Sequence, residues 1–128
     1  MRSHTMTVDF PGGQQVDAHL DGMTIVTNQD GSAPAPFALF LASIGTCAGI
    51  YVLSFCQSRG LPTEGISLVQ NLVPDPETGG IKGFSLEIQV PESFPAKYHD
   101  ALVRAASQCA VKRTIDARPE FSVTTVVR

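Results

Sequence analysis

Long runs of charge of either sign are missing from this 128-residue sequence. Nine Lys and Arg residues oppose 12 Asp and Glu residues, which leaves a net charge of −3. No basic stripe is present that would attract nucleic acid, and no Lys/Arg block that would attract an anionic membrane surface. The length favours one domain, which we place at residues 6–128. The polar start, residues 1–5, is interpreted as a cloning remnant or a disordered start, with no visible secretory signal.

The motifs of several common catalytic and metal sites are also absent. The sequence has no CxxC pair and no Cys/His cluster at zinc spacing, so we assign no metal ligand. No Gly-rich phosphate loop follows a strand, no G-x-S-x-G is present, and the dispersed acidic residues form no acid/base pair. Three cysteines are too few, and odd in number, for a secreted disulfide framework. This favours free thiols in a reducing compartment, and we expect a cytoplasmic protein.

One long stretch without charge dominates what is present, and it runs through Pro36–Arg59. Pro36 at its start and Gly60 after its end are typical helix boundary signals. A helix that is apolar nearly all round is either a core helix or a membrane span. No Lys/Arg cluster precedes it to set a membrane orientation, and strand-like segments flank it. These features favour the core helix over the membrane span.

The remaining segments predict an α+β fold with the order three strands, helix, two strands, helix, strand. The Asp21-Gly22 pair is a strong hairpin signal, and residues 81–90 alternate between apolar and polar side chains. We expect the second helix to start with Ser93 as its cap and to run without interruption to Thr114 or Ile115. The predicted strands are residues 6–10, 14–20, 23–28, 65–73, 81–90 and 121–127.

The three cysteines have different surroundings in the sequence. Cys47 has small neighbours that would let a substrate approach, although a buried structural cysteine is the commoner case. Cys56 lies about 13 Å further along the helix, too far for a disulfide with Cys47, and we interpret it as structural. Cys109 precedes two cations, Lys112 and Arg113, which would either favour its thiolate or only complement the end of the helix.

The segment PFALFLASIGTC at residues 36–47, followed by CAVKRTI at residues 109–115, resembles the OsmC/Ohr family. The resemblance covers roughly residue 16 to the C-terminus. It implies an intertwined homodimer in which a long central helix packs between strongly curved antiparallel sheets. It also implies cysteine chemistry that needs no metal, flavin or other cofactor.

The resemblance implies a thiol-dependent hydroperoxide reductase with peroxiredoxin-like chemistry. Cys47 would be the peroxidatic residue that attacks an organic hydroperoxide, and Cys109 the resolving residue that forms a disulfide with it. A dithiol, such as a lipoylated protein, would then reduce this disulfide. The substrate pocket would include Phe37, Thr46 and Tyr51.

The sequence departs from the family pattern near the expected active site. Phe37 stands where the family's hydroperoxide reductases have a glutamate, and Ala110 where a proline is usual. Residues 6–35 also contain no arginine that could stabilise the Cys47 thiolate. Arg113, Lys112 or His19 are the candidates to replace it. These departures keep open a second function, in which the protein binds a small thiol, a persulfide or a hydrophobic ligand without peroxidase turnover.

Overall fold

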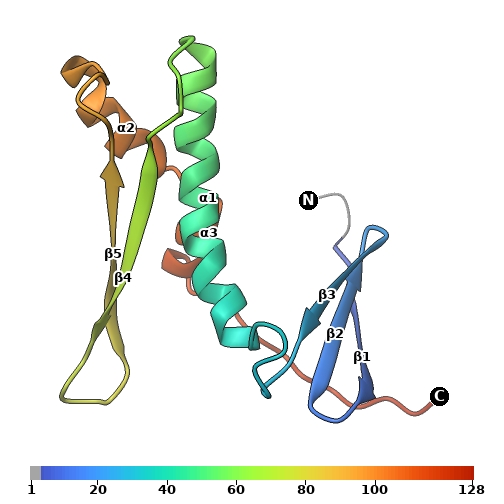
Figure 1. Ribbon diagram of the computed structural model, residues 1–128. Coiled ribbons are helices and arrows are strands. Elements are labelled where there is room, and N and C mark those ends of the chain that lie inside the picture. The colour runs from blue at the N-terminus through green and yellow to red at the C-terminus, as the bar shows by residue number, and fades with distance from the viewer. Residues whose placement is uncertain (1–3) are drawn as a thin grey trace. The chain divides into compact units, whose positions relative to one another are not determined.

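A computed structural model describes residues 4–128 of the chain, so the predicted irregular start lies mostly outside the described residues. The chain forms a mixed α+β fold of two compact units, Met1–Ala42 and Ser43–Arg128. Helix α1, Pro36–Ser58, crosses the boundary between the units (Figure 1). The single domain expected from the chain length stays a prediction.

The first unit contains an antiparallel meander of three strands, in the order β1-β2-β3. The strands are β1 (Thr7–Gly12), β2 (Gln15–Leu20) and β3 (Met23–Thr27), close to the predicted segments. Asp21 and Gly22 both have positive φ between β2 and β3, as a type I′ hairpin requires. The meander and its Asp-Gly turn are therefore confirmed.

Helix α1 begins and ends where its boundary signals predicted. At its C-terminal end Gly60 has a φ of 64°, and the N–H of Leu61 bonds to the carbonyl of Cys56 at 2.9 Å. This is a Schellman cap, in which a left-handed glycine satisfies the last helical carbonyls. By length and composition α1 could cross a membrane, a test that the core helix of a soluble protein also passes. Only 22% of its most apolar window is buried within the chain.

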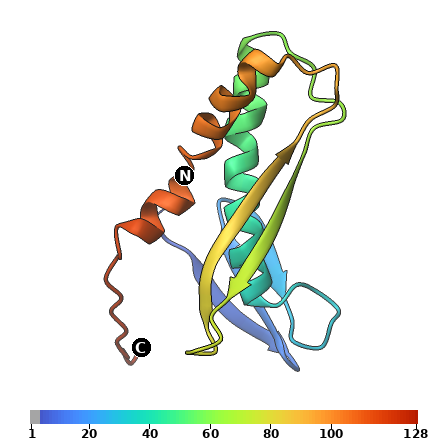
Figure 2. The same cartoon turned by 90° about the vertical axis from the view of Figure 1, so that its left-hand side faces the viewer.

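The second unit holds the hydrophobic core. Strands β4 (Ser67–Pro74) and β5 (Ile81–Gln89) form the predicted antiparallel hairpin, which runs alongside α1 (Figure 2). A short 3₁₀ helix, η1 (Ala96–Tyr98), and helix α2 (His99–Ala106) follow. One buried cluster joins α1 to the segment around α2, and it consists of Val52, Cys56, Phe94 and Leu102. The apolar side of β5 packs against this cluster through Ile88.

The predicted second helix is wrong in two respects. Its start has no Ser93 cap, because Pro95 precedes η1 and no side chain bonds to the free N–H groups there. The helix is also divided, since α2 ends at Ala106 and a further helix, α3 (Ala110–Asp116), begins after Cys109. Cys109 has extended backbone angles, φ −49° and ψ 125°, which a continuous helix does not allow.

The predicted closing strand, residues 121–127, is absent from the part of the chain that the structure describes. A strand needs a neighbour to accept and donate its backbone hydrogen bonds, and none pairs with this segment in residues 4–128. Its apolar side chains are instead almost fully exposed, as Phe121 at 92% and Val123 at 95% show.

Candidate active site: two cysteines where α3 meets α1

Cys47 lies on α1 in the second unit, partly exposed to solvent. The residues of α1 that are buried recur every four positions, which places them on one helical face: Ile44, Ala48, Val52 and Cys56. Cys47 is next to this face, at the edge between the core and the surface. A sulfur at such an edge is accessible to a reagent from solvent.

Cys109 reaches the same region because the chain breaks between α2 and α3. Its sulfur accepts the backbone N–H of Lys112 at 3.5 Å, as the cap of α3. The same sulfur lies 4.0 Å from the carbonyl oxygen of Ile44 on α1. With 2% of its surface exposed, Cys109 is buried against the helix that carries Cys47. No described cysteine forms a disulfide.

Hydrogen bonds lower the pKa of the Cys47 thiol. The largest contribution is the backbone N–H of Val111, which donates to the sulfur, while partial burial opposes the shift. The Cys109 thiol, the backbone N–H of Ala110 and the charge of Arg113 lower the pKa further. Donors that point at a sulfur stabilise the thiolate over the thiol. The site therefore favours Cys47 as the charged partner.

The pKa of the Cys109 thiol shifts in the opposite direction. Burial raises it most, and the neighbouring Cys47 raises it further through the thiol hydrogen bond and through charge. The N–H groups of Lys112 and Val111 oppose this shift. The two cysteines thus form an asymmetric pair, in which Cys47 is the better thiolate and Cys109 stays a thiol that donates to it.

The three candidate thiolate stabilisers lie in different places. Arg113 acts on Cys47 through its charge. Lys112 offers its backbone N–H to Cys109, whereas its ammonium group pairs with Asp116 at 3.0 Å. His19 lies in the first unit, where its ring bonds to Asp9 and Thr24. Sequence reasoning missed the N–H groups of Ala110 and Val111, because it placed them inside a continuous helix.

An apolar cavity of about 570 Å³ opens beside Cys109 within the second unit. Its lining comes from α1, β5, α2 and α3, and includes Leu86, Ile88, Leu102, Val103 and Cys109. The residues predicted for the substrate pocket do not line this cavity. Thr46 is exposed, Tyr51 is half-buried, and Phe37 belongs to the first unit, where its ring lies 5.7 Å from that of Phe40.

Cys56 is separate from this pair, as expected for a structural cysteine. It is fully buried in the core cluster, and burial raises the pKa of its thiol. With no second cysteine beside it in the described chain, this thiol packs as a small apolar group.

The order of strands and helices, together with one cysteine near the middle of a long apolar helix and a second at the start of a later helix, defines a recognisable α+β class. A sequence model of the OsmC-like protein family matches residues 29–124. The chain therefore belongs to the OsmC-like family. A comparison with curated protein sequences found no significant match.

Solved structures share the fold at low sequence identity. A Psychrobacter arcticus protein described as an osmotic stress induced and detoxification response protein is 18% identical, with a TM-score of 0.69 over 89% of both chains. An OsmC-like protein from Mycoplasma pneumoniae is 10% identical, with a TM-score of 0.67 over 90% of this chain and 88% of that one. An organic hydroperoxide resistance protein from Legionella pneumophila is 22% identical, with a TM-score of 0.52 over 88% and 89%.

Proposed function

We propose that the protein is a cysteine-based thiol peroxidase that reduces organic hydroperoxides, with Cys47 as nucleophile and Cys109 as resolving thiol. The observation that carries this proposal is that the Cys109 sulfur lies 4.0 Å from the Ile44 carbonyl oxygen on the helix that carries Cys47, and that the N–H of Val111 and the Cys109 thiol lower the pKa of Cys47. A nucleophilic thiolate and a second thiol within hydrogen-bonding reach are what a two-cysteine peroxidase needs.

The proposed reaction has two steps on the protein. The Cys47 thiolate attacks the distal oxygen of the hydroperoxide, the O–O bond breaks, and the alkoxide leaves with a proton as an alcohol. Cys47 is then a sulfenic acid, and the Cys109 sulfur attacks it to form a disulfide and release water. A dithiol, such as dihydrolipoamide on a protein, returns both cysteines to thiols and is itself oxidised to a disulfide.

Backbone N–H groups would supply part of the thiolate stabilisation that the glutamate and arginine provide in the family's hydroperoxide reductases. Phe37 holds the glutamate position, and the described residues before Cys47 contain no lysine or arginine. The N–H groups of Ala110 and Val111 and the Arg113 charge all favour the Cys47 thiolate, and they come from the same short segment. This segment offers an alternative way to activate the cysteine.

The direct test is consumption of cumene hydroperoxide with dihydrolipoamide as reductant. We expect turnover by the wild type and by Cys56→Ala, a thiol control outside the site, and none by Cys47→Ser. Circular dichroism would verify that each variant is folded. Equal, slow rates for wild type and Cys47→Ser would contradict the proposal.

A second function is favoured by the cavity beside Cys109. Its lining is mainly apolar, and it would suit a hydrophobic ligand or the substituent of a small thiol. In that case the protein would bind a thiol or persulfide without turnover. Intact mass separates the two functions, because peroxide treatment should remove about 2 Da through a disulfide in the first case, whereas persulfide treatment should add about 32 Da as a stable adduct in the second.

The proposed assembly is a cytoplasmic homodimer, with no nucleic acid or membrane partner and no cofactor. It is supported by apolar side chains of α1 that the single chain leaves uncovered, among them Phe37 at 53% exposure and Ile50 at 52%. Exposed apolar surface of this kind marks an interface.

A further inference from the structure

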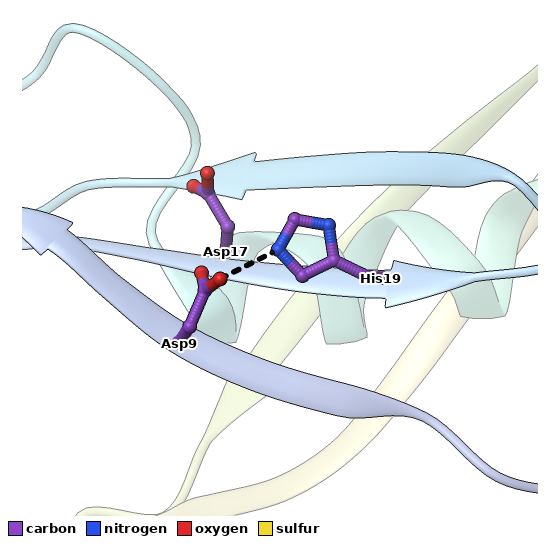
Figure 3. A group of neighbouring side chains, drawn as sticks. All are labelled: Asp9, Asp17 and His19. Atoms are coloured by element: carbon purple, nitrogen blue, oxygen red, sulfur yellow. Dashed lines mark hydrogen bonds and ion pairs between the residues drawn. The ribbon is translucent and has the colours of Figure 1, made fainter.

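We propose that Asp9, Asp17 and His19 form a divalent metal site on the β1–β2 hairpin, independent of the cysteine pair. The ligand atoms of these three residues lie within 4.8 Å of one another. All three belong to the first unit, so the geometry depends on the meander alone. Figure 3 shows the three side chains as neighbours on two adjacent strands, with the His19 ring directed at the Asp9 carboxylate.

Strand register brings the three side chains to one face. Asp9 on β1 is directly opposite Asp17 on β2. His19 follows Asp17 by two positions, and residues two apart on a strand share a face. This register is fixed by the adjacent turns, including the Asp-Gly turn after β2. The donors therefore come from a rigid element and not from a loop.

Two carboxylates directly opposite each other would be stabilised by a cation. Like charges in such a pair destabilise a sheet, and Asp17 is only 8% exposed, so water screens it poorly. No lysine or arginine occurs among residues 4–58. Gln15 donates to both oxygens of Asp17, at 3.0 and 3.2 Å, which orients the carboxylate but does not neutralise it.

The ring of His19 has the hydrogen-bonding arrangement that is usual for an imidazole bound to a metal. Its Nδ1 lies 3.0 Å from the Thr24 hydroxyl on β3, and its Nε2 lies 3.1 Å from the Asp9 carboxylate. A hydrogen bond at one ring nitrogen fixes the ring and leaves the other for an ion. The alternative use of this geometry is a simple ion pair between protonated His19 and Asp9.

The donor set selects the kind of ion. One imidazole and two carboxylates suit zinc or a similar first-row divalent ion, at about 2.0–2.2 Å from each donor. Ligand atoms around a tetrahedral ion of this kind are about 3.3–3.6 Å apart, so the side chains would close from separations of up to 4.8 Å when the ion binds. Three protein ligands leave one position open for water.

The test is zinc titration of untagged protein by isothermal calorimetry, in a Cys47→Ser/Cys109→Ser background that removes the competing thiols. We expect one zinc ion per chain, and at least about tenfold weaker binding for Asp17→Asn and His19→Gln. Thr24→Val should weaken binding about 10- to 100-fold through loss of the hydrogen bond to the ring. Asp21→Asn is the matched control, because Asp21 is an exposed carboxylate in the turn between β2 and β3. Asparagine also tolerates its positive φ.

Thermal unfolding gives a second readout that does not depend on peroxidase activity. Bound zinc should raise the unfolding midpoint of the background protein and of Asp21→Asn, but not that of His19→Gln. Equal binding by His19→Gln and the background protein, or no binding by either, would overturn the metal site and leave the ion pair.

Discussion

The backbone N–H of Val111 donates to the sulfur of Cys47, and this bond contributes most to the lowered pKa of that thiol. The donor is available because the chain leaves α2 at Ala106 and starts α3 only after Cys109. In a continuous helix this N–H would bond to the carbonyl four residues earlier. The break between α2 and α3 therefore leaves the N–H of Val111 available to Cys47, and so lowers the pKa of that thiol.

The first prediction concerns the pH dependence of Cys47 alkylation. Because its pKa is lowered, the thiolate should persist at a pH below the usual thiol pKa of about 8.5, and be lost only as the pH falls through the lowered value. The alkylation rate by iodoacetamide, followed by mass spectrometry of the Cys47 peptide, should have its midpoint below that pH. Arg113→Gln should move the midpoint upward, because it removes a favourable charge. A wild-type midpoint at or above about 8.5 would contradict this explanation.

The second prediction separates the roles of the two cysteines. Cys109→Ser should still reduce about one equivalent of hydroperoxide, because the nucleophile is intact, and then stop as a sulfenic acid. Trapping with dimedone should label Cys47 in this variant and hardly at all in the wild type, where the disulfide forms first. Strong labelling of Cys47 in both proteins would show that Cys109 does not resolve the sulfenic acid.

Much of the fold could be predicted from local signals. Asp21-Gly22 fixed a hairpin, Pro36 and Gly60 bounded α1, and the alternation in β5 identified its buried side. Each of these features depends on residues close together in the sequence. Local chemistry was therefore enough for most elements, whereas the choice of Cys47 and Cys109 as a pair came from the family resemblance.

The remainder depends on contacts between distant residues. Nothing in Gln108-Cys109-Ala110 breaks a helix as proline or glycine would, and the break brings the Cys109 sulfur to the carbonyl of Ile44 on α1. The strand over residues 121–127 needs a partner that the described chain does not supply. The pairing of Asp9 with Asp17 likewise follows from strand register, which composition alone does not reveal.

The third prediction tests the core of the second unit. Leu102 is 2% exposed and contacts the cluster around Cys56, so Leu102→Ala should lower the free energy of unfolding by about 2–5 kcal/mol. Val103 is the adjacent control, since it is 58% exposed and Val103→Ala should cost far less. Urea denaturation measures both. Similar losses for the two variants would mean that Val103 is covered in solution, for example by a second chain.

The last prediction concerns the exposed side of α1. The helix is too apolar for a solvent-facing surface, and Ile50 is 52% exposed in the single chain. If a second copy covers this side, Ile50→Glu places an unpaired charge in the interface and should cost about 3 kcal/mol or more, which weakens dimerisation over 100-fold. Light scattering after size exclusion would detect the resulting monomer.

Asn71→Asp adds the same charge at an exposed polar position of β4, the strand that meets α1 on the side of Gly45 and away from Ile50, and it should leave the dimer intact. If α1 instead spanned a membrane, the wild type would sediment with the membrane fraction and require detergent. A wild type that is monomeric without detergent, or an Ile50→Glu variant as dimeric as Asn71→Asp, would show that this side of α1 is not a dimer interface. Both variants add one negative charge, so a difference between them reports whether Ile50 lies in the interface.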